Sequence, residues 1–158
     1  MAPSSSVSVR RARRDDVAII VGMLADDALG RARERIEEPL PASYFAAFEK
    51  VDGNPGIQLV VAEDNEGNVV GCLQLAILPG ISSQGASRGL IEDVRVATHC
   101  RSRGIGELMV QWAVNEARAK GCVLVELLTH SSRVDAQRFY ERLGFARSHV
   151  GMTVRFDR

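Results

Sequence analysis

The feature that most constrains the fold is one continuous segment, residues 90–128, in which an apolar run, a turn of arginines and glycines, an amphipathic pattern and a second apolar run follow one another. The run LIEDVRV (90–96) predicts a strand, and GELMVQWAVNEARAK (106–120) predicts a helix. The second run, CVLVELL (122–128), is nearly all apolar and predicts a buried central strand. The predicted helix should bury one face, made of Leu108, Met109, Trp112 and Ala113. Such a strand–helix–strand unit predicts an α/β domain.

The rest of the chain adds strands and helices on both sides of this unit. Strands are predicted at 7–9, 57–63 and 69–78, helices at 17–28, 42–51 and 135–143, a polar loop at 81–89, and a last strand or hairpin at 145–156. Their order predicts a mixed α/β fold in one domain, residues 7–158, behind a disordered tail, residues 1–6.

Composition narrows the functional classes. The 158 residues include 20 basic and 20 acidic side chains, so the formal net charge is zero. This balance argues against a general nucleic-acid binder or a protein of anionic membranes, which usually carry a basic surplus. No apolar run reaches transmembrane length. Cys72, Cys100 and Cys122 form no CxxC pair, which indicates reduced thiols in a cytoplasmic protein. Adjacent His99 and Cys100 have no second pair, so no metal site is predicted.

The turn CRSRGIGELM (100–109) is the strongest candidate for a binding site. The first amides of a helix lack intrahelical partners, and the helix dipole adds partial positive charge there. Glycines let a ligand approach the backbone, so phosphate is the favoured ligand. The nucleotide P-loop needs a Lys-Ser or Lys-Thr pair that is missing here, and the dinucleotide fingerprint needs a small residue where Met109 stands. A plain turn with incidental arginines remains the alternative.

Two motifs carry a resemblance to a known family. RSRGIG (101–106) resembles the Arg/Gln-x-x-Gly-x-Gly/Ala signature of the GNAT acyltransferase superfamily, and DAQRFYERLGF (135–145) resembles its "A..FYE.LGF" segment. The order of elements between the two motifs also agrees. The resemblance implies a single mixed, mostly antiparallel sheet with splayed central strands, flanked by helices. It also implies an N-acetyltransferase that uses acetyl-CoA and no metal.

The resemblance assigns roles to individual positions. The backbone of Val94 to Val96 would bind the pantetheine arm, and the amides from Ser102 to Gly106 would bind the pyrophosphate. Tyr140 would protonate the leaving thiolate. Many relatives carry asparagine where this chain has Arg133, so the contact made there is in question. The full predicted cosubstrate-binding set is Val94, Arg95, Val96, Arg101, Ser102, Arg103, Gly104, Ile105 and Gly106.

The reaction also needs a base, because a primary amine is mostly protonated at neutral pH. Glu92, on the strand before the turn, is the favoured candidate, since several relatives place a catalytic glutamate on that strand. Strand alternation predicts that its neighbour Asp93 points to the opposite face. An exposed or ion-paired carboxylate at a strand end is the alternative interpretation for either residue.

The acceptor is an amine of a small molecule or a protein, and the sequence does not identify it. Acidic Glu34, Glu37 and Glu38 could attract a cationic amine, or could form a solvated surface. His130 is interpreted as a loop histidine without a role. A homodimer is possible. A non-catalytic acyl-CoA-binding or regulatory module on the same fold is the alternative function.

Overall fold

The computed structural model describes residues 6–157 as a mixed α/β structure built on one sheet. The strand order is β1-β2-β3-β4-β5; the first four strands are antiparallel to their neighbours, and β4 and β5 are parallel. The strands are β1 (Ser8–Arg11), β2 (Ile57–Glu63), β3 (Val69–Leu78), β4 (Ser87–Val96) and β5 (Cys122–Leu127). The helices are α1 (Val17–Leu24), α2 (Ala28–Arg31), α3 (Ala42–Asp52), α4 (Ser82–Gly85), α5 (Ile105–Ala119) and α6 (Val134–Arg142), with short 3₁₀ turns at Arg14–Asp16 and Thr98–Cys100. The expected mixed, mostly antiparallel sheet is confirmed.

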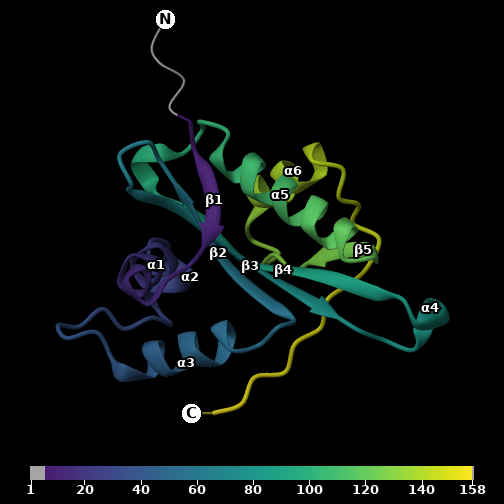
Figure 1. Cartoon of the computed structure of the whole chain (residues 1–158), viewed down its shortest axis with the longest axis horizontal. Coiled ribbons are helices and arrows are strands. Elements are labelled where there is room, and N and C mark those ends of the chain that lie inside the picture. The colour runs from purple at the N-terminus through teal and green to yellow at the C-terminus, as the bar shows by residue number, and fades with distance from the viewer. Residues whose placement is uncertain (1–5, 158) are drawn as a thin grey trace, which may run out of the picture.

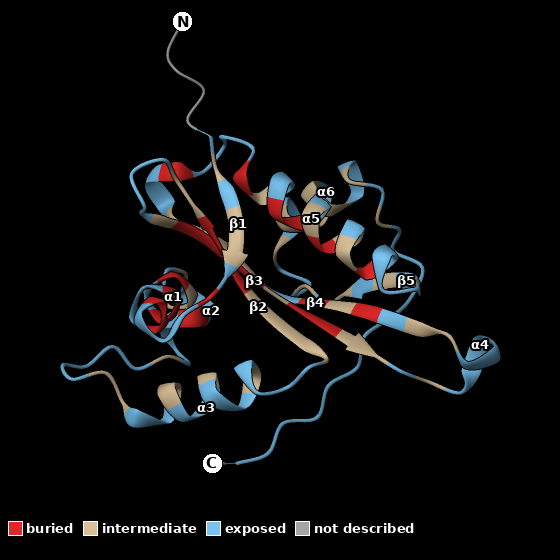
Figure 2. Ribbon diagram, viewed as in Figure 1, coloured by how far each residue is buried: buried red, intermediate tan, exposed pale blue. Residues whose placement is uncertain are grey.

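Helices cover both faces of the sheet. Figure 1 shows α1 and α3 on one side and α5 and α6 on the other. Figure 2 shows the buried residues along the central strands and on the faces of α1 and α5 that meet them. Strand alternation divides the apolar side chains between two cores. The α5 side contains Val60, Leu73, Leu75, Ile91, Met109 and Val110, and the α1 side contains Ile20, Met23, Val61 and Cys72.

The structure corrects several predicted boundaries. The first helix ends at Leu24 rather than at residue 28, because the Asp27 carboxylate accepts a 2.5 Å hydrogen bond from the Gly30 amide and caps α2. The predicted polar loop is shorter than 81–89, since β4 begins at Ser87. On α5, Met109 is buried, whereas Leu108 is 41% exposed and does not belong to the buried face.

The prediction that the last apolar run forms a buried central strand is wrong. β5 lies at the edge of the sheet, and its Val123 and Leu124 are 62% and 46% exposed. The predicted last strand or hairpin at 145–156 is also not formed, and this segment carries no strand assignment. Both corrections have the same cause, which is that the segment 145–156 does not pair with β5. Within residues 6–157 only β4 pairs with β5, so β5 lies at the edge of the sheet.

Three further expectations concern the chain as a whole. The disordered tail, residues 1–6, lies outside the described residues except for Ser6. Between residues 6 and 157, no helix combines the length and the apolar character needed to cross a bilayer. All three cysteines are free; Cys72 and Cys100 are buried and Cys122 is half-buried.

A buried ion pair holds the entry to α1. Asp16 is the one buried charged residue among those described. It accepts hydrogen bonds of 2.8 and 3.1 Å from the Arg10 guanidinium and one of 2.7 Å from the Arg13 amide. Burial by itself would raise the pKa of Asp16, but these hydrogen bonds more than offset that effect and hold the pKa below its ordinary value of 3.8. The pair joins β1 to the start of α1.

We expect Asp16→Asn to lower the free energy of unfolding at neutral pH by about 2–3 kcal/mol, because it leaves the Arg10 charge without this partner. A depressed folded-state pKa stabilises above the unfolded value and loses that contribution as the pH falls. The difference between wild type and variant should therefore shrink below about pH 4. Urea unfolding at several pH values measures it, and a difference that stays constant down to acid pH would contradict the assignment.

Candidate active site

The parallel strands β4 and β5 separate part of the way along the sheet. Their pairing runs from Ser87 and Cys122 to Ile91 and Leu127 and then stops, while β4 continues to Val96. β5 itself ends at Leu127, and a cavity lies between the rest of β4 and residues 128–130, where the two strands were predicted to splay apart. Beyond Ile91, the side of β4 that faced β5 has no strand partner within the described chain, so its backbone groups can bind an extended ligand.

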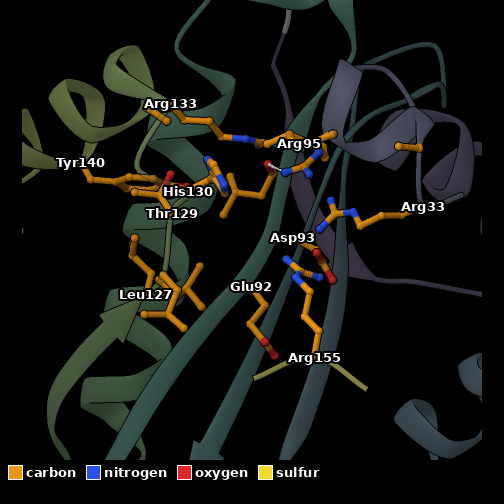
Figure 3. A pocket seen from close by; sticks show the side chains of 16 residues that line it. Arg33, Glu92, Asp93, Arg95, Leu127, Thr129, His130, Arg133, Tyr140 and Arg155 are labelled. Atoms are coloured by element: carbon orange, nitrogen blue, oxygen red, sulfur yellow. Dashed lines mark hydrogen bonds between the residues drawn. The ribbon is translucent and has the colours of Figure 1, made fainter. Parts of the chain in front are cut away.

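A β-bulge lies at the point where the strands separate. Cys72 pairs with Arg95 and Gln74 with Glu92, so two residues of β4 stand opposite one residue of β3. Asp93, in the bulge, has a left-handed backbone with φ of 53°. The bulge interrupts side-chain alternation, and Glu92 and Asp93 both line the same cavity (Figure 3). The prediction that Asp93 points to the opposite face is therefore wrong.

Two cavities occupy the gap and meet at Tyr140. The small cavity, of about 390 Å³, is lined by Glu92 and Asp93 and by Arg33 and Arg155. The large cavity, of about 940 Å³, extends along α6 to the loop before α5. Both are lined by Leu29, Val94, Arg95, Arg133, Ala136 and Tyr140. One continuous groove therefore connects the loop, the tyrosine and the two carboxylates.

The loop before α5 presents amide groups to the large cavity. Ser102 and Gly104 both have positive φ, 60° and 79°, and Gly104 is the residue before the first turn of α5. Within residues 6–157, no carbonyl or side chain accepts the amide protons of Ser102, Arg103 or Gly104. The first amides of α5 add further free donors and the positive end of the helix dipole. This loop has the chemistry of an anion site.

Eight of the nine residues predicted to bind the cosubstrate line the large cavity. Arg103 is the exception, and it does not line either cavity. Arg101 lines the large cavity, but its guanidinium donates to the Val96 carbonyl at 3.3 Å and to the Asp26 carboxylate at 3.4 Å. The free hydrogen-bond donors of this loop are therefore its backbone amides. The Arg101 side chain instead links the loop to β4 through the Val96 carbonyl.

Tyr140, on α6, lies at the junction of the two cavities. Its ring packs edge-to-face against Phe139 and Phe145, with centroids 5.1 and 5.8 Å away. Burial raises the pKa of Tyr140 above its ordinary value of 10.0, although the charges of Arg95 and Arg133 act in the opposite direction. The hydroxyl therefore stays protonated at neutral pH and is available as a proton donor.

Arg133, the residue that departs from the GNAT pattern, is held across the groove. Its Nη2 donates to the Asp27 carboxylate at 2.6 Å, and Arg95 lies 3.9 Å from the same oxygen. Burial would raise the pKa of Asp27, but the Gly30 amide and the charges of Arg133, Arg95 and the more distant Arg33 more than offset it, and the pKa is lowered. Asp27 thus stays ionised and fixes both guanidinium groups at the junction.

The residues that form this groove, apart from Arg155, lie in a segment that matches a known protein family. Residues 22–145 match the model of the family described as "Acetyltransferase (GNAT) family". The chain belongs to this family. The GNAT chain is similar to a crystallised protein of Bacillus halodurans C-125 described as a transcriptional regulator, at 44% identity and a TM-score of 0.92, over 96% of this chain and 100% of that one.

Two curated relatives are named acetyltransferases. The aminoalkylphosphonate N-acetyltransferase of Salmonella typhimurium is 42% identical over 65 residues, which are 41% of this GNAT chain and 42% of the relative. The glucosamine 6-phosphate N-acetyltransferase of Trypanosoma brucei brucei is 37% identical over 83 residues, 52% of this chain and 54% of the relative. The chain thus spans about half the length of these relatives.

Sequence reasoning missed two of the arginines that line the small cavity of this GNAT protein, Arg33 and Arg155. The acidic residues of the loop after α2 do not line either cavity: Glu34 accepts a hydrogen bond from the Tyr44 hydroxyl, and Glu37 pairs with Arg35. Arg33, from the same charged run, lines the small cavity instead. The run GRARERIEE shows only that this loop is charged, and its backbone path decides which side chain turns inward.

His130 also lies closer to the GNAT groove than the sequence indicated. It lines the small cavity beside Thr129, and Figure 3 shows both near Tyr140. Its Nδ1 lies 2.7 Å from the Ser132 hydroxyl. Its position three residues after the end of β5 was the only sequence signal, since ligands often approach an α/β sheet near strand ends.

Proposed function

We propose that this GNAT protein transfers an acetyl group from acetyl-CoA directly to a primary amine, without an acyl-enzyme intermediate. The observation that carries the proposal is the continuous groove, which joins free amides at one end, Tyr140 at the junction and two carboxylates at the other end. Each of these features suits one part of the reaction.

The donor side is supported by the loop before α5 and by the free edge of β4. A diphosphate fits the loop because the amides of Ser102, Arg103 and Gly104 have no acceptor among the described residues. The backbone from Val94 to Val96 can then hydrogen-bond the amides of the pantetheine arm as an added strand would. This path leads a thioester to the junction at Tyr140.

Acetyl-CoA, when bound, supplies the thioester carbonyl that a neutral amine attacks. Glu92 or Asp93 accepts the proton of the acceptor ammonium, directly or through water, because both carboxylates line the acceptor side of the groove. Tyr140 donates its hydroxyl proton to the departing thiolate as the carbon–sulfur bond breaks. The attacking nitrogen loses its second proton as the amide forms, and this proton restores the Tyr140 hydroxyl, directly or through water. The products are an N-acetyl amide, coenzyme A with a free thiol and the one proton that the carboxylate accepted and then releases.

The small cavity, which forms the acceptor side of the groove, favours a small molecule as the acceptor because of its limited volume. The small cavity has a volume of about 390 Å³ and is bordered by the loop after α2 and by the C-terminal segment. The two curated relatives are both named for the acetylation of small amines. We therefore propose a small-molecule amine rather than a protein amine as the acceptor.

Thiol release by the purified protein, given acetyl-CoA and a panel of primary amines, tests the proposed function. Thermal unfolding with coenzyme A, and separately with ATP, tests the donor site, because a ligand that binds the native state raises the melting temperature. Stabilisation by coenzyme A without turnover of any amine would favour the non-catalytic acyl-CoA-binding module. Stabilisation by ATP alone would contradict both.

We also propose that residues 7–158 act as one acetyltransferase domain and that the protein works in the cytoplasm. The family match to residues 22–145 supports the first statement. The second is supported by the three free cysteines, since unpaired thiols persist in reducing compartments.

The protein is further proposed to form a homodimer through its C-terminal segment, 150–156. Alternate side chains of this segment point into solvent: Val150, Met152, Val154 and Phe156 are 90%, 92%, 77% and 84% exposed. The residues between them are exposed as well; the segment passes Leu128 at Gly151, and Arg155 lines the small cavity. The neighbouring edge of β5 is also apolar and exposed. A second copy fits, because each chain offers the same apolar strip to the other.

Met152→Glu should convert this dimer to a monomer, because it places a charge in the apolar strip. Ile81→Glu is the matched control, since Ile81 is equally exposed, at 96%, on the turn between β3 and β4. Light scattering coupled to gel filtration measures the masses. A monomeric wild type, or a dimer unaffected by Met152→Glu, would overturn the proposed interface.

A further inference from the structure

More basic than acidic side chains line the small cavity, which does not suit an acceptor that is a simple cationic amine. Four guanidinium groups line it, against the two carboxylates Glu92 and Asp93. These arginines are Arg33, Arg95, Arg133 and Arg155. A simple alkylamine is cationic in solution, so this excess of positive charge would repel it.

The four arginines fall into two pairs with different surroundings. Arg95 and Arg133 share the Asp27 carboxylate at the junction. Arg33 and Arg155, by contrast, form no ion pair within 4.0 Å with any residue that the structure describes. The second pair therefore has charge available for a ligand.

The free pair converges from segments that are far apart in the sequence. Arg33 comes from the loop after α2, and Arg155 comes from the C-terminal segment. Figure 3 shows both side chains reaching toward the Asp93 carboxylate from different sides, with Glu92 alongside. The arrangement alternates positive and negative groups over a short distance, which suits a ligand that itself carries both charges.

We infer that the acceptor is a small zwitterionic amine, in which the amino group faces Glu92 and Asp93 and an anionic group is bound by Arg33 and Arg155. The inference rests on the proposed acetyl transfer and names its substrate class. Guanidinium groups bind carboxylate, phosphonate and phosphate oxygens through paired, charge-assisted hydrogen bonds. With the anion held there, the amine is directed toward the carboxylates and the junction at Tyr140.

The inference predicts a preference among amines of matched size. The probes are 2-aminoethyl phosphate, 3-aminopropanoate and propylamine, which present a phosphate, a carboxylate and no anion. Wild type should use at least one anionic probe with a kcat/KM about 100-fold above that for propylamine, because two charged contacts are gained. The ranking of the first two probes distinguishes a phosphate site from a carboxylate site.

Substitution of the free arginines should remove this preference. In Arg33→Gln, we expect the ratio of kcat/KM for the best anionic probe to that for propylamine to fall about 10- to 100-fold, mainly through KM. Arg155→Gln should act in the same direction. Arg31→Gln is the matched control, since Arg31 is exposed on α2 and does not line either cavity.

A binding measurement separates this inference from the proposed function. Calorimetric titration of 2-aminoethyl phosphate and 3-aminopropanoate into wild type and Arg33→Gln needs no turnover. Binding that depends on Arg33, with no acetylation of any amine, would sustain the anion site and refute the acetyl transfer. Acetylation of propylamine as efficient as that of both anionic probes, or an unchanged ratio in Arg33→Gln, would overturn the anion site and leave the acetyl transfer standing.

Discussion

Replacement of Tyr140 by phenylalanine is expected to lower kcat by about 100- to 1,000-fold, which is the usual contribution of a positioned proton donor. The hydroxyl lies at the junction of the two cavities, and the ring is held by Phe139 and Phe145. Phenylalanine keeps these ring contacts, so the fold and the KM for acetyl-CoA should change little. Thiol release at saturating acetyl-CoA and amine measures the effect.

The chain contains a second tyrosine that serves as the control. Tyr44 donates its hydroxyl proton to Glu34 and does not line either cavity, so Tyr44→Phe should leave kcat near the wild-type value. Equal kcat values for Tyr140→Phe and Tyr44→Phe would remove Tyr140 from the mechanism.

The raised pKa of Tyr140 adds a pH dependence to this comparison. The proposed role needs the protonated hydroxyl, and burial moves its pKa above 10.0. The ratio of wild-type to Tyr140→Phe rates should therefore stay constant between about pH 6 and pH 9 and fall only at higher pH. A ratio that already falls near neutral pH would show that the hydroxyl is not the group that matters.

The second large effect is expected from Gly104→Asp. Gly104 has φ of 79°, a conformation that aspartate and asparagine tolerate better than other side chains. A carboxylate at the start of a helix also complements the dipole, so the folded state should survive. It would, however, stand beside the proposed diphosphate, and two like charges a few ångströms apart repel by several kcal/mol in a partly exposed site. We expect the KM for acetyl-CoA to rise by about 100-fold.

Gly104→Asn is the matched control, because asparagine has the same shape and backbone tolerance without the charge. Its KM should rise much less than that of the aspartate variant. Thermal unfolding verifies that both variants fold, and the shift in melting temperature with coenzyme A reports binding directly. Similar losses in both variants would mean that the added side chain blocks the loop sterically and that its charge is irrelevant.

Individual strands and loops of this GNAT fold could be predicted because each depends on residues that are close together in the sequence. The strands 57–63 and 69–78 were predicted with their observed bounds, since alternating and apolar runs end there at turn residues. The loop before α5 was placed by its glycines and by the amphipathic pattern that follows. Eight of the nine residues predicted to bind the cosubstrate, in this loop and in β4, line the groove, and Arg103 does not.

The errors arose wherever a side chain's environment depends on distant segments. The apolar run of β5 has the composition of a central strand, yet its place at the edge depends on whether the C-terminal segment pairs with it. The direction of Asp93 depends on a bulge that β3 and β4 form together, and no local pattern at residues 92–95 shows it.

The sequence by itself determined the order of the five strands and of the helices α1, α3, α5 and α6, the free amides at the start of α5 and the position of Tyr140 on α6. These follow from periodicity, capping and backbone preference, which act over a few residues. Only the tertiary structure decided that Arg33 and Arg155 meet beside Glu92 and Asp93. Their positions are 122 residues apart, and packing of whole elements, rather than any local preference, brings them together.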